Sequence, residues 1–142
     1  MASRRQSQAA RAAAFALLLP LADAARSQAA ACLAYEPQVV SIEGRLELKL
    51  YPGGPHYKSI EGGDMPEPTW ILTPRAPICL DEIPGDDWNR ARSGIEFIQV
   101  LPRMAMPHGV NGHVVRVEGT LYRPRSGHPH SAIVLRATAV TP

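Results

Sequence analysis

The sequence predicts a small all-β domain, and three observations lead to that prediction. Apolar and polar residues alternate over residues 40–50, which is the pattern of a strand with one buried face. Turn-forming residues, 14 prolines and 11 glycines, separate several other short apolar runs. No stretch has the apolar spacing of a long amphipathic helix. The length of 142 residues fits one small domain.

The N-terminal residues have the composition of an export signal. Three arginines precede an apolar run over residues 12–21, and small-residue sites follow at residues 22–24 and 29–31. These are the parts of a secretory signal peptide, and the apolar run is shorter than the about 20 residues that cross a bilayer. We predict a signal peptide over residues 1–24, with cleavage as late as residue 31 possible.

The remaining chain is then one exported domain over residues 32–141, in the periplasm or outside the cell, without a transmembrane helix. Lipoprotein anchoring at Cys32 is not expected, because Ala29 stands where such signals usually carry leucine. The formal charge of +2 comes from 15 basic and 13 acidic residues, and the leader holds the excess. Charge this balanced argues against nucleic acid as a partner.

The two cysteines, Cys32 and Cys79, both lie after the leader. An oxidising compartment favours a disulfide between them, which would stabilise the domain by about 4 kcal/mol in the chain-entropy model. The alternative is a pair of unpaired buried thiols. Two cysteines alone are too few for a structural zinc site.

The first two predicted strands cover residues 38–50 and 69–80. The first strand has one apolar face, interrupted by a glycine, and the prolines and glycines of residues 51–55 end it. That face consists of Val40, Ile42, Gly44, Leu46, Leu48 and Leu50. The second strand contains Pro74 and Pro77, which are typical of an edge or a broken strand.

The last three predicted strands cover residues 95–101, 113–123 and 131–140. A polar loop over residues 81–94, with one helical turn at residues 87–92, precedes them. The fourth strand carries Val-x-Val-Glu-Gly-x-Leu, which repeats the Val-x-Ile-Glu-Gly-x-Leu of the first strand. A shared interior glycine indicates a bend or bulge. Five strands, two of them bent, favour a small, partly open OB-like barrel.

In an OB-like barrel, the loops after strands one and four border the ligand-binding surface. Here these loops are residues 51–68 and 123–131, and both contain histidine, proline and glycine. Proline-stiffened loops lose less entropy on binding. We predict that ligand contacts come from Tyr51, His56, Tyr57, Arg125, His128 and His130. The favoured function is therefore an exported, non-enzymatic binding module whose ligand is a cell-envelope component, a protein or a small molecule.

An alternative hypothesis is a metal site. His128 and His130 stand two residues apart, so in an extended segment they share a face, and His56 could supply a third ligand. The protein would then be a transition-metal carrier or a metal-dependent enzyme. No cofactor is expected if the protein is a binding module, and a third possibility is that the histidines only stiffen a turn. No nucleophile motif is present, so no catalytic residue is assigned.

Several short motifs follow one another along residues 32–140. In order they are Cys32-Leu33-x-Tyr35-Glu36-Pro37, Tyr51-Pro52-Gly53-Gly54-Pro55-His56-Tyr57, Gly63-Asp64-x-Pro66-Glu67, Pro77-Ile78-Cys79 and Gly127-His128-Pro129-His130-Ser131. This set resembles domain-of-unknown-function family 4431, which consists of small exported bacterial proteins. The resemblance implies no reaction, and it supports pairing of Cys32 with Cys79. The family's Gly-His-His-His-Thr motif is altered here, because Pro129 and Ser131 occupy its third and fifth positions.

Overall fold

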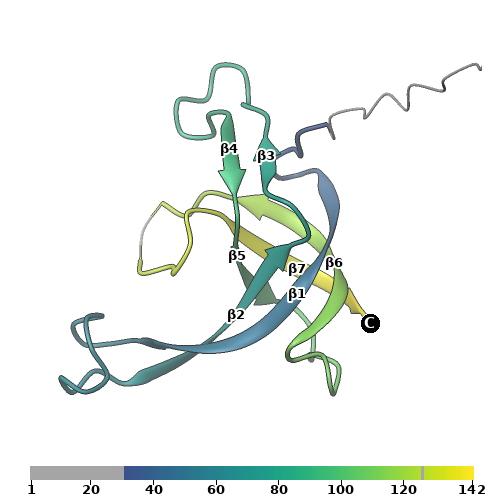
Figure 1. Cartoon of the computed structure of the whole chain (residues 1–142). Helices are drawn as coiled ribbons and strands as arrows, with labels where there is room; N and C mark the ends of the chain where they lie inside the picture. Colours follow the sequence, from purple (N-terminus) through teal and green to yellow (C-terminus); the bar gives the residue numbers. More distant parts are fainter. Residues whose placement is uncertain (1–30, 126) are drawn as a thin grey trace, which may run out of the picture.

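The computed structural model describes residues 31–125 and 127–142, and Figure 1 shows their arrangement. The predicted signal peptide lies outside the described residues, apart from Ala31. The described part is all-β, as predicted, and contains no helix. Its strands are β1 (Val39–Pro52), β2 (Pro66–Pro74), β3 (Ile78–Leu80), β4 (Arg92–Ile95), β5 (Ile98–Pro102), β6 (His113–Tyr122) and β7 (Val134–Thr141).

Five of these strands form a ring in the order β1-β2-β5-β7-β6, and β6 pairs back with β1. The β5–β7 pair is parallel, and the other four pairs are antiparallel. Strands β3 and β4 form a separate two-stranded sheet beside one end of the ring (Figure 1). The predicted five-stranded, all-β architecture is therefore confirmed.

The two glycines of the repeated motif mark places where neighbouring strands approach closely. A Cβ atom on Gly44 would lie 2.8 Å from the Pro74 Cα, and one on Gly119 would lie 2.9 Å from the Ala137 Cα. Both distances are shorter than any carbon–carbon contact that packing allows. At Gly119 the β6–β7 register also shifts, which is the irregularity expected of a bulge.

The interior of the ring is a continuous apolar core. Among its fully buried side chains are Leu46, Leu72, Ile98, Val115, Val117, Leu121 and Leu135. The alternation of the first strand predicts this inward face correctly as far as Leu46. Beyond it the prediction is wrong, because Leu48 and Leu50 are 43% and 64% exposed.

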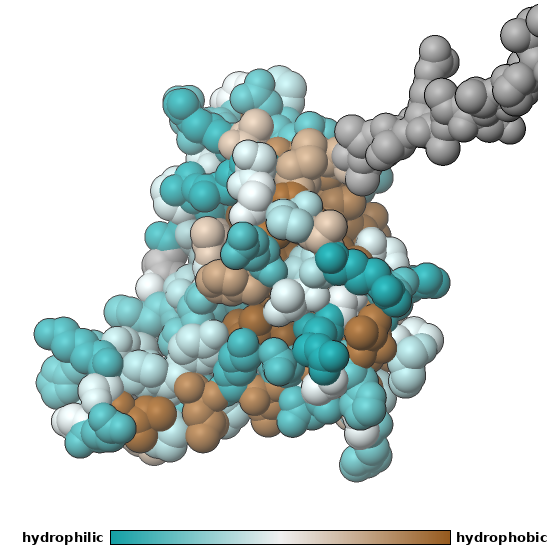
Figure 2. Space-filling model, in the orientation of Figure 1, coloured by the Kyte–Doolittle hydropathy of each residue, from teal (hydrophilic) through white to brown (hydrophobic). Residues whose placement is uncertain are grey.

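Strand β1 leaves the ring at this point. Its pairing with β6 ends at Leu46, whereas its pairing with β2 continues to Pro52. Residues 47–69 therefore form a two-stranded extension with a loop at its tip, which we call the arm; it projects from the ring in Figure 1. Exposed apolar side chains gather along it (Figure 2), and they include Leu48, Leu50 and Met65.

Several predicted strand boundaries are wrong. Tyr51 and Pro52 pair with Glu67 and Pro66, so β1 does not end before residue 51. Prolines are tolerated there because each strand of the arm has an open edge. The last strand begins at Val134 rather than at residue 131, because Ser131 uses its hydroxyl to bind the backbone of a neighbouring strand.

Two predicted strands are each divided in two. Residues 69–80 separate into β2 and β3, because the segment with Pro77 leaves the ring. Residues 95–101 separate into β4 and β5, and β4 already begins at Arg92, inside the predicted polar loop. The expected helical turn at residues 87–92 is not formed; Asp86 instead caps the backbone N–H groups of Trp88 and Asn89.

The predicted disulfide is confirmed. Cys32 and Cys79 are bonded, with 4.7 Å between their Cα atoms. Hydrogen bonds on both sides reinforce the link: the Leu33 N–H donates to the Cys79 carbonyl (2.8 Å), and the Asp81 N–H donates to the Leu33 carbonyl (2.9 Å). The bridge thus fastens the segment before β1 to β3. Within the described residues, no helix has the length and apolar character needed to cross a membrane.

Candidate functional site

The loop at the tip of the arm is organised around the buried carboxylate of Asp64. This carboxylate accepts backbone N–H groups from Lys58 (2.7 Å), Ser59 (2.9 Å) and His56 (2.8 Å). The Lys58 and Ser59 hydrogen bonds are the main reason that the pKa of Asp64 falls to about 2. The His56 Nδ1 atom lies 3.3 Å from the same carboxylate. His56 therefore helps to close the loop, and its side chain remains largely exposed.

The loop between β6 and β7, residues 123–133, is held against β5 through Gln99. The Ser131 hydroxyl accepts the Gln99 backbone N–H (2.8 Å) and donates to the Ile133 carbonyl. The Gln99 side-chain Oε1 atom accepts the backbone N–H of His130 (2.7 Å). These hydrogen bonds hold the part of the loop that carries His130 against β5.

Two histidine–tyrosine stacks join the β6–β7 loop to the arm. The rings of His128 and Tyr57 have centroids 3.6 Å apart and planes 14° apart. Those of His130 and Tyr51 are 4.1 Å and 11° apart. We call these four residues the clasp. The two loops that the sequence singles out therefore meet in the fold.

His130 is the buried member of the clasp. Its side chain is 12% exposed, and its Nε2 atom lies 3.7 Å from the Glu67 Oε2 atom. No described residue makes a hydrogen bond to this buried Nε2 atom. Glu67 is therefore a close neighbour of His130 without a hydrogen bond to it, and it adds a second arm residue to the contact.

A pocket of about 290 Å³ lies between the arm and the β6–β7 loop. We call it the arm groove. Its lining residues are Tyr57, Glu67, Gln99, Leu101, Tyr122, Pro124, Gly127, His128, Pro129 and Val134. The strands supply a floor with an amide and a carboxylate, and the loop supplies an imidazole and two rigid prolines. The larger part of the lining surface is polar, so several groups are present that can orient a ligand.

Arg125 lies apart from the other predicted contact residues. Its guanidinium carbon is 5.3 Å from the centre of the Trp88 ring, and that of Arg123 is 4.0 Å from the same ring. Trp88 and Arg123 also exchange hydrogen bonds, from the indole Nε1 to the Arg123 carbonyl (3.1 Å) and from the Arg123 guanidinium to the Trp88 carbonyl (2.9 Å). Arg125 thus packs at the start of the loop and does not line the arm groove. Of the six predicted contact residues, only Tyr57 and His128 line it; Tyr51, His56 and His130 are also outside its lining.

Several lining residues of the arm groove are not among the predicted contacts. Gln99 and Leu101 enter it because β5 pairs with β2, a register that the sequence does not reveal. Glu67 lies within the first predicted loop, residues 51–68, and Tyr122 directly precedes the second. The sequence does show that Gln99 lies on the opposite face of the strand from the buried Ile98 and Val100, and this polar face could have indicated a contact residue.

The histidines proposed as metal ligands have different partners. His128 stacks on Tyr57, His130 stacks on Tyr51, and His56 faces Asp64. No group of three metal-ligating side chains occurs in residues 31–125 and 127–142. The metal hypothesis remains a prediction from the sequence.

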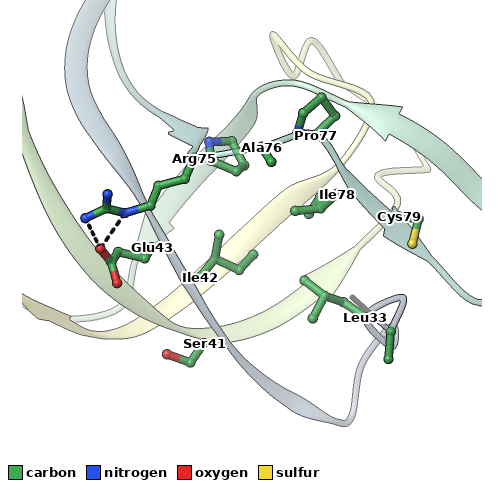
Figure 3. A pocket seen from close by; sticks show the side chains of 11 residues that line it. Leu33, Ser41, Ile42, Glu43, Arg75, Ala76, Pro77, Ile78 and Cys79 are labelled. Atoms are coloured by element: carbon green, nitrogen blue, oxygen red, sulfur yellow. Dashed lines mark hydrogen bonds and ion pairs between the residues drawn. The ribbon is translucent and has the colours of Figure 1, made fainter. Parts of the chain in front are cut away.

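A second pocket, of about 300 Å³, lies beside the disulfide and is shown in Figure 3. Apolar side chains such as Leu33, Ile42 and Ile78 line most of it. At its rim, the Arg75 guanidinium donates to the Glu43 carboxylate, and this hydrogen bond lowers the pKa of Glu43. Few polar groups are left to orient a ligand there, so the arm groove is the better candidate site.

The comparisons with known proteins give no match: no family model, no curated protein and no solved structure corresponds to this chain. The resemblance to family 4431 therefore stays a prediction from the order of the motifs. The site has to be interpreted from its own geometry.

Proposed function

We propose that this chain is an exported, non-enzymatic binding module that holds its ligand in the arm groove. The barrel that carries the groove is OB-like in this proposal. Its ring order and its single parallel pair, β5–β7, support that assignment. In OB-folds the loops after the first and fourth barrel strands flank the ligand, and here those loops carry the clasp.

The observation that carries this proposal is the clasp. Two ring stacks fix the β6–β7 loop against the arm and leave a pocket between them. Aromatic stacks contribute about 0.5–1.5 kcal/mol each beyond the area that they bury. A site fixed before the ligand arrives loses less conformational entropy on binding, so its contacts contribute more to affinity.

Export is supported by the disulfide. Bonded cysteines persist in oxidising compartments such as the periplasm or the cell exterior. The basic, apolar and small-residue segments of the leader point to the same route.

The proposal is tested by a ligand screen with residue resolution. The full chain, isotope-labelled and with its disulfide intact, is screened by NMR against neutral oligosaccharides, organic amines and short peptides. We expect amide shifts at the clasp and the arm groove for at least one class. Hits that map elsewhere on the barrel would contradict the proposal.

A double variant sharpens the test. Tyr57→Ala with His128→Ala removes one stack and one wall of the groove, so bound hits should lose most of their affinity. His113→Ala is the matched control, because His113 is an exposed histidine of β6 that does not line the groove. Equal affinity in the double variant and the wild type would overturn the assignment of the site.

A further inference from the structure

We infer that the ligand of the arm groove carries an organic ammonium group, an inference that rests on the proposed function. The first argument is charge. Glu67 is the only formally charged side chain among the lining residues, and its side chain is 44% exposed. No lysine or arginine lines the pocket, and His130, 3.7 Å from the Glu67 carboxylate, makes no hydrogen bond to it, so an anionic ligand would meet this carboxylate without a cationic lining residue to offset it. A cation would complement it.

The second argument is the aromatic lining. Tyr57 and Tyr122 both line the groove, and the face of a tyrosine ring attracts a cation through its quadrupole. Tyr57 is 38% exposed although His128 stacks on it, so part of this residue remains accessible to a ligand. Tyr122 already makes such a contact with one face, because the Arg136 guanidinium carbon lies 4.2 Å from its ring centre, so a ligand can use only the remaining ring surface. Arg136 is paired with Glu36 at 2.6 Å and is not among the residues that line the groove.

The third argument concerns size and wall chemistry. A volume of about 290 Å³ is at the lower end for ligand pockets, so it suits a single head group. Leu101, Pro124, Pro129 and Val134 give apolar walls that can contact methyl or methylene groups. A bare metal ion would find one carboxylate and one imidazole among the lining residues, whereas an alkylammonium group uses the carboxylate, the rings and the walls together.

The test compares a cation with its neutral copy. The labelled full chain is titrated with choline, with ethanolamine, and with the neutral isostere of choline in which a tert-butyl group replaces the trimethylammonium group. We expect an ammonium compound to shift the amides of Tyr57, Glu67 and Gln99, with the neutral isostere about tenfold weaker. Tighter binding of choline points to a quaternary ammonium source, and tighter binding of ethanolamine points to a primary amine such as a lysine side chain.

A matched pair of variants separates the effect of a charge inside the groove from the effect of the net charge of the protein. Glu67→Gln should weaken ammonium binding about tenfold. Glu47→Gln, which makes the same change in net charge on the arm but outside the groove, should leave the affinity within about twofold. If Glu67→Gln does not fold, as judged by its thermal unfolding, the wild-type comparison of choline with its isostere still decides.

Two results would overturn the inference. Equal affinity of choline and its isostere would mean that the groove recognises the shape of the ligand and gains nothing from its charge. In that case the proposed function stands and the ammonium assignment fails. Absence of any ammonium-induced shift in the groove also refutes the assignment. The broader screen then shows whether the groove binds another class or no ligand at all, and only the latter removes the proposed function as well.

Discussion

At the scale of single residues, Asp64 shows how one carboxylate shapes a loop. Its three backbone hydrogen bonds hold the loop that follows Gly54, where the backbone pairing with Met65 ends. Each of these bonds favours the charged carboxylate, and together they lower the pKa of Asp64 from 3.8 to about 2. The order of the arm tip therefore depends on the ionisation of one side chain.

This dependence predicts a pH effect with a definite sign. Because the folded pKa is the lower one, the stabilisation by Asp64 is complete above about pH 4 and is lost as the pH falls through about 2. Amide exchange of Lys58 and Ser59 should quicken over that range more than its intrinsic pH dependence explains. Asp64→Asn should show rapid exchange at neutral pH as well. Unchanged protection at pH 2 would contradict this account.

The two motif glycines give a second prediction at this scale. Alanine at Gly44 or Gly119 places a methyl group against the backbone of the adjacent strand, so each variant should lose about 3 kcal/mol or more of unfolding free energy. Gly62→Ala is the control, since its nearest neighbour would be the Ser59 Cβ at 3.4 Å, an ordinary contact. Urea unfolding measures all three. A small loss at Gly44 and Gly119 would mean that β1 and β6 shift easily.

At the scale of elements, the clasp joins two segments that are far apart in the sequence. A double-mutant cycle on Tyr51 and His130 should give a coupling energy of about 0.5–1.5 kcal/mol, the value typical of aromatic pairs. The same cycle on Tyr51 and the unconnected His113 should give a value near zero. Equal values in the two cycles would show that the stack contributes no energy of its own.

The sequence predicts the elements better than it predicts their ends. Alternation identifies β1 and its inward face, because it reports the two chemical environments of a strand. Alternation does not report how far the neighbouring strand extends. Leu48 is exposed because β6 begins only at His113, opposite Leu46, and does not reach Leu48. The division at Pro77 could be suspected from the proline. The division between β4 and β5, at Glu96, depends on the pairing of β4 with β3, and no local sequence pattern indicates that pairing.

The candidate site follows the same rule. The barrel prediction places the two histidine-containing loops at the same surface, and in the structure the two loops are in contact. Which histidine stacks on which tyrosine depends on the path of the β6–β7 loop across β5. Gln99 enters the groove only through the β2–β5 register, and Arg125 is drawn away by Trp88. These are tertiary relations that local sequence patterns do not encode.

At the scale of the whole molecule, the disulfide connects residues 47 positions apart in a domain of limited core. Closing a loop of this length should stabilise the fold by about 4 kcal/mol through the unfolded chain. We expect urea unfolding of the Cys32→Ser, Cys79→Ser double variant to show a loss near that value, and reduction of the wild type to match it. A loss below about 1 kcal/mol would indicate that the unfolded chain is already compact.

The arm also has a consequence for the behaviour of the protein in a crowded solution. Outside the ring, residues 47–52 and 66–69 each have an edge that no described strand covers. Open edges invite pairing with other chains and hence aggregation. On the β2 side, Pro66 and Pro68 lack the N–H groups that an added strand would need, and on the β1 side Glu47 and Lys49 place charges beside the edge. Pro66 and Pro68, which the sequence places in a loop, therefore oppose edge-to-edge pairing along the arm.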